Sequence, residues 1–388
     1  MIKNLGSTIP FNKPFIAGKE LSYIRQAVVR NCHTSGGGDF TKKCQDWLNR
    51  MLGAGAAFLT HSCTAALEMS AILCNIQPGD EVIMPSFTFV STANAFALRG
   101  ALPVFIDIRS DTLNIDENLI LPAISPRTRA IVPVHYGGVA CAMDQILEIA
   151  SNHGLFVIED AAQAMLSIYK GRYLGTLGHI GCLSFHETKN VTSGEGGAIL
   201  INNELNPTLA ETAEIIWEKG TNRRAFFQGS TDKYTWVQLG SSFLPSELSA
   251  AFLFAQLECA HKIVNKRRIL VRLYHDNLSS LEKGGYITLP PVQTGDSNAN
   301  GHVFYVLTSG DRERGMLINF LANRGITAVF HYVPLHSSPA GRRYGRTASD
   351  LVVTDDISSR LLRLPLYYGM NPTDVEQVSQ AVHSFYCG

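Results

Sequence analysis

The segment from residue 155 to residue 197 constrains the fold of this 388-residue chain more than any other. Leu155 to Glu159 is a short apolar run rich in β-forming residues, which is typical of a buried parallel strand. The run ends at Asp160, and open α/β sheets bind ligands at the carboxyl ends of their strands. A second strand, about Ile180 to Phe185, leads to Lys189 and a Gly-rich loop. The pattern therefore predicts an acid in a crevice and a lysine on a polar loop.

Strands and helices alternate through the first part of the chain, which predicts a mostly parallel sheet covered by helices. The further strands that apolar runs predict are Ala56–Thr60, Glu81–Pro85, Leu102–Ile108 and Arg129–Val134. Beyond about residue 255 the pattern changes to a long charged helix, 257–281, and strand-like pieces at 302–307 and 327–330. We therefore predict a large domain over residues 1–255, beginning with an N-terminal arm, and a small α+β domain over residues 256–388.

Composition argues against several classes of protein. Lys plus Arg and Asp plus Glu number 33 each, so no net charge favours nucleic acid or an acidic membrane surface. The eight cysteines form no CxxC pair, which is typical of buried thiols in a reducing compartment. The N-terminus lacks an apolar signal core and no run of about 18 apolar residues exists, so we expect a cytoplasmic protein without membrane segments. His33, His61 and Cys63 lack metal-ligand spacing, so no metal site is predicted.

A buried acid together with a loop lysine suits pyridoxal phosphate (PLP). This cofactor needs a lysine that holds it as a Schiff base and a carboxylate against its ring nitrogen. The carboxylate keeps the pyridine ring protonated, so that the ring withdraws electrons from a substrate carbanion. A lysine that acts as a nucleophile must lose its proton, which burial and nearby cations favour. Taken by themselves, Asp160 and Lys189 are more often a structural ion pair or a surface lysine.

Three motifs surround these residues: EDAAQ at 159–163, SFHETKN at 184–190 and GEGG at 194–197. Together they resemble the sugar-nucleotide aminotransferases of the DegT/DnrJ/StrS family, which are PLP enzymes of fold type I. The resemblance implies a mostly parallel seven-stranded sheet in the large domain. It implies that Lys189 is catalytic and binds PLP covalently, and that Asp160 pairs with the ring nitrogen. Gln163 would hydrogen-bond the 3-oxygen of the ring, and Ser184 would bind the phosphate.

Further cofactor contacts are predicted at the ends of two other strands. Ser62, Cys63 and Thr64 stand between a strand and a helix N-terminus, where free N–H groups and the helix dipole attract anions. An ordinary helix N-cap explains the same residues, but the family holds the PLP phosphate at this turn, often with glycine in place of Cys63. Phe89 matches the aromatic residue that stacks on the PLP ring in related enzymes. A core phenylalanine is the alternative for Phe89, and Phe87 is the competing candidate for stacking.

Polar residues elsewhere are candidates for the same site. In much of the family an Asn reaches the PLP phosphate across the dimer interface; here Ser242 takes its place, and Leu244 stands where the family has an Arg. Ser242 can still donate one hydrogen bond to the phosphate. The HYVPLH motif contains His331, Tyr332 and His336, which either face the sugar substrate or lie at the domain interface. His135 ends a strand, and it either lines the active site or is a satisfied structural residue.

The resemblance extends over nearly the whole chain and is strongest to family members that make TDP-4-amino-4,6-dideoxygalactose for the enterobacterial common antigen. The runs that carry it are QPGDEVIMPSFTFVSTANAF, GHIGC, SFHETKN and GSSFLPSEL. It implies a homodimer with the active site at its interface, which moves the amino group of L-glutamate to C4 of a TDP-4-keto-6-deoxyhexose. A sugar-nucleotide 3- or 4-aminotransferase that gives a different epimer and a non-catalytic PLP-fold binding protein are the alternatives. A PLP-dependent sugar dehydratase would carry histidine in place of Lys189.

Overall fold

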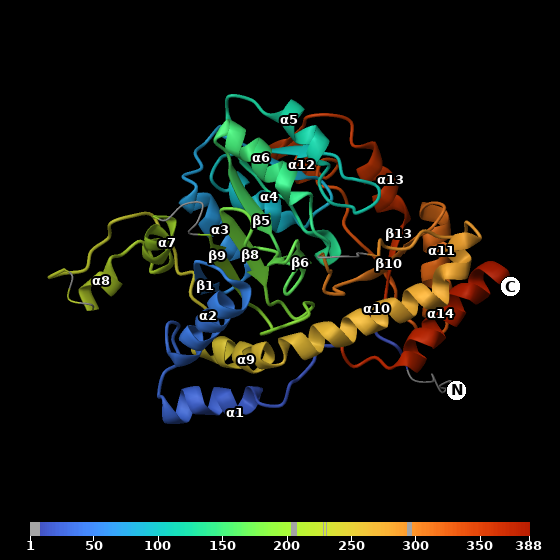
Figure 1. Ribbon diagram of the computed structural model, residues 1–388, viewed down its shortest axis with the longest axis horizontal. Coiled ribbons are helices and arrows are strands. Elements are labelled where there is room, and N and C mark those ends of the chain that lie inside the picture. The colour runs from blue at the N-terminus through green and yellow to red at the C-terminus, as the bar shows by residue number, and fades with distance from the viewer. Residues whose placement is uncertain (1–7, 203–207, 228, 230, 293–296) are drawn as a thin grey trace.

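The computed structural model describes residues 8–202, 208–227, 229, 231–292 and 297–388. The first seven residues of the predicted N-terminal arm lie outside these ranges. A central sheet has helices on both sides, and a smaller group of strands and helices lies beside it toward the C-terminus (Figure 1).

The central sheet contains the predicted strands in a mostly parallel arrangement. In order across the sheet, its strands are β1 (Ala56–Thr60), β9 (Gly197–Ile201), β8 (Ile180–Ser184), β5 (Phe156–Asp160), β4 (Thr128–Ile131), β2 (Glu81–Pro85), β3 (Leu102–Ile106) and β12 (Arg346–Thr347). Neighbouring strands pair in parallel except β9, which runs antiparallel to both β1 and β8. The first seven strands are the predicted seven-stranded sheet. The two-residue β12, from the C-terminal part of the chain, adds an eighth strand beside β3.

The central strands are buried on both faces, because successive side chains alternate between two hydrophobic layers. In β5, Val157 belongs to one layer and Ile158 to the other. Helices that contribute to the first layer are α2 (Asp39–Leu52), α6 (Met143–His153), α9 (Glu247–Glu258) and the start of α10 (Ala260–Lys283). Helices that contribute to the second are α3 (Cys63–Leu73), α4 (Val90–Ala97) and α7 (Leu209–Trp217). Burial on both faces explains why the strands are continuous apolar runs in the sequence.

Shorter elements connect this framework. They are α1 (Glu20–Arg25) with a π-helix (Gln26–Arg30), two 3₁₀ turns (Glu117–Leu119 and Tyr136–Gly138), α5 (Ile120–Ala123), the hairpin β6 (Ile168–Tyr169) and β7 (Arg172–Tyr173), α8 (Arg223–Phe227), α12 (Pro339–Tyr344) and α13 (Val352–Arg360). The predicted helix 257–281 is interrupted at Cys259, where φ −106° and ψ 2° leave the helical region, so α10 begins at Ala260. Within the described ranges, no helix is long and apolar enough to span a membrane.

A second, antiparallel sheet forms in the C-terminal part of the chain. Its strands, in order, are β10 (Phe304–Leu307), β13 (Leu361–Leu364) and β11 (Val329–Phe330). This sheet shares a hydrophobic cluster with the second half of α10, α11 (Asp311–Ala322) and α14 (Pro372–Cys387). Ile9 from the N-terminal arm bridges Ile326 and joins the same cluster. The long α10 connects the two hydrophobic regions, and the division of the chain at residue 255 stays a prediction.

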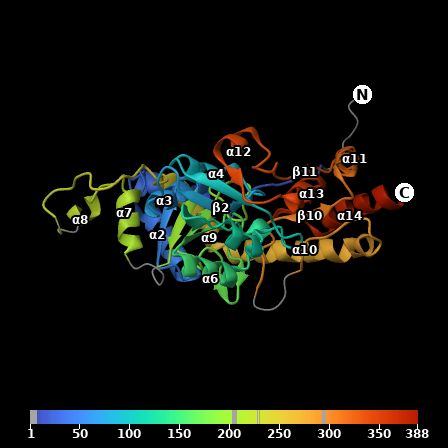
Figure 2. The same ribbon diagram turned by 90° about the horizontal axis from the view of Figure 1, so that it is seen from above.

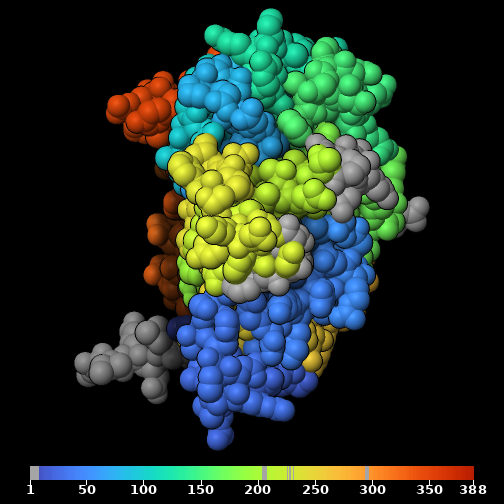
Figure 3. Space-filling model, turned by 90° about the vertical axis from the view of Figure 1, so that its left-hand side faces the viewer, coloured from blue at the N-terminus to red at the C-terminus, as the bar shows by residue number. Residues whose placement is uncertain are grey.

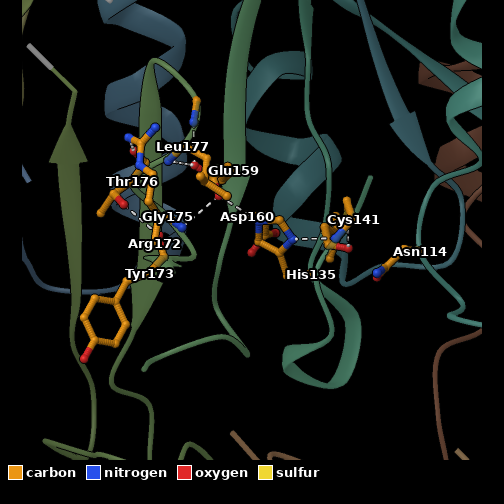
Figure 4. Close-up of polar contacts among 12 residues, drawn as sticks. Asn114, His135, Cys141, Glu159, Asp160, Arg172, Tyr173, Gly175, Thr176 and Leu177 are labelled. Carbon is orange, nitrogen blue, oxygen red and sulfur yellow. Dashed lines mark hydrogen bonds and ion pairs between the residues drawn. The ribbon is translucent and has the colours of Figure 1, made fainter. Parts of the chain in front are cut away.

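A buried network of hydrogen bonds ties β5 to its surroundings (Figure 4). Nε2 of His135 lies 2.8 Å from the Glu159 carboxylate, which also accepts three backbone N–H groups from the segment 175–178. Nδ1 of His135 accepts the backbone N–H of Cys141 at 3.2 Å, so the imidazole is neutral and its ring hydrogen, on Nε2, is donated to Glu159. Burial would raise the pKa of Glu159, but the hydrogen bonds from His135 and from the backbone lower it. His135 is therefore a satisfied structural residue, the second of the two alternatives.

We expect Glu159→Gln to lower the free energy of unfolding by about 3 kcal/mol or more, because it disturbs four hydrogen bonds to a buried carboxylate and a hydrogen bond to a charged group contributes about 1.5–3 kcal/mol. The amide would also turn an NH₂ group toward backbone N–H groups that need an acceptor. Urea unfolding at neutral pH measures the change. The control is Asp144→Asn, which breaks the exposed ion pair with Lys170 and should leave stability nearly unchanged.

The sign of the pH dependence provides a second measurement on the same variant. Because the pKa of Glu159 is lowered in the folded protein, its contribution to stability is complete above the pKa of an unfolded glutamate, about 4.3. That contribution is lost as the pH falls through the folded pKa. The stability gap between the wild-type protein and Glu159→Gln should therefore shrink as the pH falls below about 4.3. A gap that stays constant down to the acid unfolding of the protein would mean that the pKa of Glu159 is not lowered by folding.

Candidate active site

A cavity of about 810 Å³ opens at the carboxyl ends of β1, β2, β5 and β8. This is the edge at which parallel sheets bind ligands, and the volume suits a small-molecule site. Residues from the C-terminal sheet close the other side. The predicted residues that line the cavity are Ser62, Cys63, Thr64, Phe89, Asp160, Gln163, Ser184, Lys189, His331 and Tyr332.

Asp160 reaches the cavity because it is the last residue of β5 and faces away from Glu159. Its Oδ2 accepts a hydrogen bond of 2.8 Å from Oγ1 of Thr92 on α4, and its Oδ1 accepts the backbone N–H of Ala162 at 3.1 Å. Thr88 lies 2.8 Å from the Thr92 hydroxyl. Since Thr92 gives its only hydroxyl hydrogen to Asp160, Thr88 donates to Thr92. The carboxylate is thus held in one orientation by a chain of hydroxyl groups.

Lys189 lies on the turn after β8, where its backbone N–H donates to the carbonyl of His186. Burial in the cavity lowers the pKa of its amine, against the opposing effects of Cys63 and Asp160. Among the described residues, none hydrogen-bonds its Nζ. The amine is therefore easier to deprotonate than an ordinary lysine and is available to a ligand.

The turn before α3 forms an anion cradle. Ser62 caps the helix by accepting the Ala65 N–H at 3.1 Å, while the N–H groups of Cys63 and Thr64 have no acceptor among the described residues. The Thr64 hydroxyl lies 2.7 Å from that of Ser91. A Cβ on Gly197, in β9, would stand 2.4 Å from the carbonyl carbon of Ser62, so only glycine lets this strand approach the turn. The last glycine of GEGG is thus explained by packing against the cradle.

Gln163 is held with a fixed amide orientation. Its Oε1 accepts the N–H of Gly137 at 2.7 Å, in the left-handed turn of the HYGG motif, and its Nε2 donates to the Tyr332 hydroxyl at 2.7 Å. Because a backbone N–H can only donate, the oxygen must face Gly137 and the NH₂ group must face the cavity side. Tyr332 keeps its own hydroxyl hydrogen for a ligand, since burial and the charge of Asp160 raise its pKa.

His331 stacks on Tyr332, with ring centroids 3.7 Å apart, and its Nδ1 lies 2.7 Å from the Tyr136 hydroxyl. Burial raises the pKa of Tyr136 well above its ordinary value, so this phenol keeps its proton and donates it. Burial, followed by Arg363 and Lys189, lowers the pKa of His331 well below its ordinary value. We therefore assign a neutral imidazole with its hydrogen on Nε2.

Phe89 and Phe87 occupy different environments. Phe89 precedes α4, lines the cavity and is 57% exposed, whereas Phe87 is 1% exposed and packs on Tyr136. Only Phe89 has a free ring face for a planar ligand. This supports the predicted choice of Phe89 over Phe87.

Sequence patterns did not single out His302, which also lines the cavity. Asn190 donates through Nδ2 to the Asn300 carbonyl at 3.1 Å, so its Oδ1 accepts from Nδ1 of His302 at 3.2 Å. Burial, Lys189 and Arg267 lower the pKa of His302 well below its ordinary value. The ring therefore keeps a lone pair on Nε2. Its neighbours are distant in sequence, so no local pattern could have found it.

Two predicted residues lie elsewhere. Ser242 is exposed, forms a bridge with Glu218 and is not among the described residues that line this cavity. Because it was predicted to reach a partner subunit, one chain does not test its role. His336, also in HYVPLH, hydrogen-bonds Ser86 at 2.8 Å and so joins the C-terminal part of the chain to the central sheet.

The chain matches the DegT/DnrJ/EryC1/StrS aminotransferase family over residues 14–383. This chain belongs to that family. It is 32% identical over 397 residues to the spore coat polysaccharide biosynthesis protein SpsC of Bacillus subtilis, with 100% of each chain covered. It is 34% identical over 383 residues to the uncharacterized protein MJ1066 of Methanocaldococcus jannaschii, with 97% of each covered. The crystal structure of the aminotransferase TlmJ from Streptoalloteichus hindustanus shares 29% identity and a TM-score of 0.88, over 98% of this chain and 99% of that one.

This DegT/DnrJ/EryC1/StrS member is a PLP-dependent aminotransferase with the α/β fold of the type I enzymes. Its cavity fits the cofactor on physical grounds. A deprotonatable amine and an oriented carboxylate share one cavity with an anion cradle, as an aldehyde, a pyridine nitrogen and a phosphate require. Within the described residues, no cluster of three or more His, Cys, Asp or Glu side chains is arranged to hold a metal ion.

We expect Thr92→Val to lower turnover of this aminotransferase roughly 10- to 100-fold, because a hydrogen bond to a charged group contributes about 1.5–3 kcal/mol. The substitution keeps the shape of the side chain and removes the donor to Asp160, together with the acceptor of the Thr88 hydroxyl. Turnover and the dissociation constant of PLP are measured on the same preparation. The control is Thr212→Val on α7, whose hydroxyl donates only to its own helix. Unchanged turnover in Thr92→Val would show that Asp160 does not need this donor.

Proposed function

We propose that this aminotransferase acts on a nucleotide sugar and moves the amino group of L-glutamate to C4 of a TDP-4-keto-6-deoxyhexose. The products would be TDP-4-amino-4,6-dideoxygalactose and 2-oxoglutarate, as for the transaminase of enterobacterial common antigen synthesis. The observation that carries the proposal is the shared cavity of Lys189 and Asp160, built from the same motifs that resemble that enzyme. The polysaccharide role in the printed name of SpsC supports a sugar substrate.

Four residues of the cavity are proposed to bind the phosphate of the cofactor. Ser62, Cys63, Thr64 and Ser184 would bind the phosphate through the two free N–H groups of the cradle and the hydroxyl groups around it. Cys63 stands where glycine is common, but burial raises the pKa of its thiol well above the ordinary value, so it adds no charge.

The ring contacts follow from the same geometry. Asp160 would keep the ring nitrogen charged, and Gln163 would donate its remaining Nε2 hydrogen to the ring 3-oxygen. Phe89 would cover one ring face.

Lys189 would carry the proton transfers. When bound, PLP supplies an electron sink for the negative charge that develops on the carbon bearing the amino group. The neutral Nζ of Lys189 takes the proton from Cα of the donor, and in the second half of the reaction it returns a proton to C4 of the sugar. His331 and Tyr332 would donate hydrogen bonds to the sugar from the opposite wall.

The alternatives differ in the product rather than in this machinery. A 3-aminotransferase, or a 4-aminotransferase of the other epimer, would use the same Lys189 and Asp160. A PLP-dependent dehydratase is disfavoured by the lysine at position 189. A non-catalytic binding protein is disfavoured by the lowered pKa of that lysine, which binding alone does not require.

We also propose that the protein is a homodimer whose active site lies at the interface. The segment around α8 extends away from the rest of the chain (Figures 1 and 2), and Figure 3 shows the molecule from the side on which this segment lies. It exposes apolar side chains that a second copy would cover: Tyr234 (54%), Trp236 (72%), Val237 (50%) and Leu239 (49%). Ser242 follows directly and would contact the partner's cofactor phosphate. The eight free cysteines support a reducing compartment such as the cytoplasm.

We expect Lys189→Ala to abolish turnover and to lose the visible absorbance of covalently held PLP, because no other described lysine lines the cavity. Loss of a general base alone costs about 10²- to 10⁴-fold, and loss of the covalent anchor adds to it. Single-turnover assays with glutamate and absorbance spectra measure both effects. The control is Lys170→Ala, an exposed lysine paired with Asp144.

Asp160→Asn separates binding from chemistry in the same assays. It should retain PLP and still lose most of the rate, because the amide cannot pair with a protonated ring nitrogen. Retained turnover in Lys189→Ala would refute the assignment. A near-normal rate in Asp160→Asn would show that another group charges the ring.

We expect incubation of the protein with PLP, L-glutamate and TDP-4-keto-6-deoxyglucose to yield an amino sugar with nitrogen at C4 in the galacto configuration. NMR of the purified nucleotide sugar identifies the carbon and the epimer. Replacement of the substrate by the 3-keto isomer is the matched control. Amination of only the 3-keto sugar, or a gluco product, would establish one of the alternatives instead.

A further inference from the structure

The backbone of His302, which lines the cavity, is held by α10. Arg267 of that helix is 4% exposed, and it donates through Nε to the Gly301 carbonyl at 2.8 Å and through Nη2 to the His302 carbonyl at 2.7 Å. Gly301 has a φ of +64°, and a Cβ on it would stand 3.0 Å from the carbonyl carbon of Arg267, so this close approach needs glycine. The place of His302 in the cavity wall is therefore fixed without any use of its ring.

The ring of His302 is tied to the turn that carries Lys189. Asn190 follows Lys189 in the chain and is 5% exposed. Its Nδ2 donates to the Asn300 carbonyl at 3.1 Å, and its Oδ1 accepts the Nδ1–H of His302 at 3.2 Å. One buried side chain thus joins the turn of the lysine to the imidazole, and the lysine and the imidazole line the same cavity.

Three histidines among the described residues line the cavity, and they differ in which ring nitrogen is free. Nδ1 of His186 accepts the backbone N–H of Thr188 at 3.3 Å, and Nδ1 of His331 accepts the Tyr136 hydroxyl at 2.7 Å. The ring hydrogens of these two histidines therefore lie on Nε2. His302 has the opposite tautomer, and no donor from the described residues reaches its Nε2. Of the three imidazoles, His302 is thus the one that can accept a hydrogen bond from a group in the cavity.

The electrostatics of the cavity agree with a contact between His302 and Lys189. After burial, the charge of Lys189 is the largest cause of the lowered pKa of His302, so the two side chains lie close together. A carboxylate in place of the imidazole would hold the lysine amine protonated. The two carboxylates among the described lining residues, Asp160 and Glu195, have other partners. A neutral imidazole accepts a hydrogen bond from the amine and still leaves it easy to deprotonate.

We propose that His302 is the positioning residue of Lys189: its Nε2 accepts one N–H of the lysine amine and so directs the amine lone pair at the reacting carbon. The proposal rests on the proposed function, in which Lys189 carries the proton. When Nζ takes the proton from Cα of the donor it becomes an ammonium group, and one of its N–H groups donates to Nε2 of His302. The proton stays on Lys189 until Lys189 delivers it to the accepting carbon, and none passes to His302. Because a hydrogen bond from an ammonium is stronger than one from an amine, the contact stabilises the charge that develops on Nζ.

Two substitutions separate this role from a purely structural one. His302→Asn keeps an amide N–H where Nδ1 donates to Asn190 but has no group at the position of Nε2, whereas His302→Gln places an amide oxygen near that position and loses the Nδ1 donor. We expect His302→Asn to slow the single-turnover reaction of the PLP-loaded enzyme with L-glutamate roughly 10- to 100-fold, the range for a lost hydrogen bond to a charged group. His302→Gln should be faster than His302→Asn, and it covers the case in which the asparagine variant binds PLP poorly. A structural role through Asn190 alone predicts the reverse order.

Glutamate deuterated at Cα identifies the step that is slowed. The primary isotope effect in His302→Asn should be at least as large as in the wild-type enzyme, because proton removal is the step that loses its contact. The matched control is His383→Asn on α14, where Nε2 donates to the Asn277 carbonyl at 2.9 Å outside the cavity. Its rate should equal that of the wild-type enzyme.

Three results overturn the proposal: a wild-type rate in His302→Asn, a rate in His302→Asn that equals or exceeds that of His302→Gln, or a smaller isotope effect. The measured reaction needs no sugar, so its result does not depend on which carbon of the sugar is aminated. A wild-type enzyme that does not react with glutamate would instead reject the proposed donor. The same comparison with an amino acid that the enzyme does accept then decides the role of His302.

Discussion

Two consecutive carboxylates at the end of β5 determine how the rest of the structure is arranged. Because a strand sends successive side chains to opposite faces, Glu159 is buried in one layer and Asp160 opens into the cavity. The Glu159 carboxylate accepts hydrogen bonds from His135 and from three backbone N–H groups, and these bonds fix the register of the strand. A shift of one residue would exchange the two acids, so the hydrogen bonds to Glu159 behind the sheet specify the position of Asp160 in front of it.

Several polar side chains of the cavity are pre-organised, because each is held by a hydrogen bond to a neighbouring residue on one side. Gln163 is oriented by Gly137, His331 by Tyr136 and His302 by Asn190, which leaves the other side of each group toward the cavity. Burial keeps both imidazoles neutral and favours a neutral Lys189. Charge is thereby concentrated on Asp160 and Arg363, where it can act on ligands without reorganisation during the reaction.

The site depends on contact between the central sheet and the C-terminal part of the chain. His331, Tyr332 and Arg363 belong to the segment that carries the small sheet, whereas Asp160 and Lys189 follow strands of the large one. The contact is maintained by hydrogen bonds such as Ser86 to His336 and by β12 pairing with β3. Movement between the two parts would therefore change the cavity and its electrostatics together.

Local patterns in the sequence determined the strands and the mostly parallel sheet, and they predicted that Asp160 ends a strand and that Lys189 follows one. Apolar runs between helices have few other ways to be buried, and the carboxyl ends of such strands converge on one edge. Resemblance to a family added Gln163, Ser184 and the cradle, which composition alone did not distinguish from an ordinary N-cap. Only the tertiary structure showed that Phe89 lines the cavity whereas Phe87 is buried, placed His135 behind the sheet and Thr92 against Asp160, and brought His302 and Arg363 to the cavity. These placements depend on burial and on hydrogen bonds between residues that are distant in sequence. The local spacing of apolar residues does not encode such contacts.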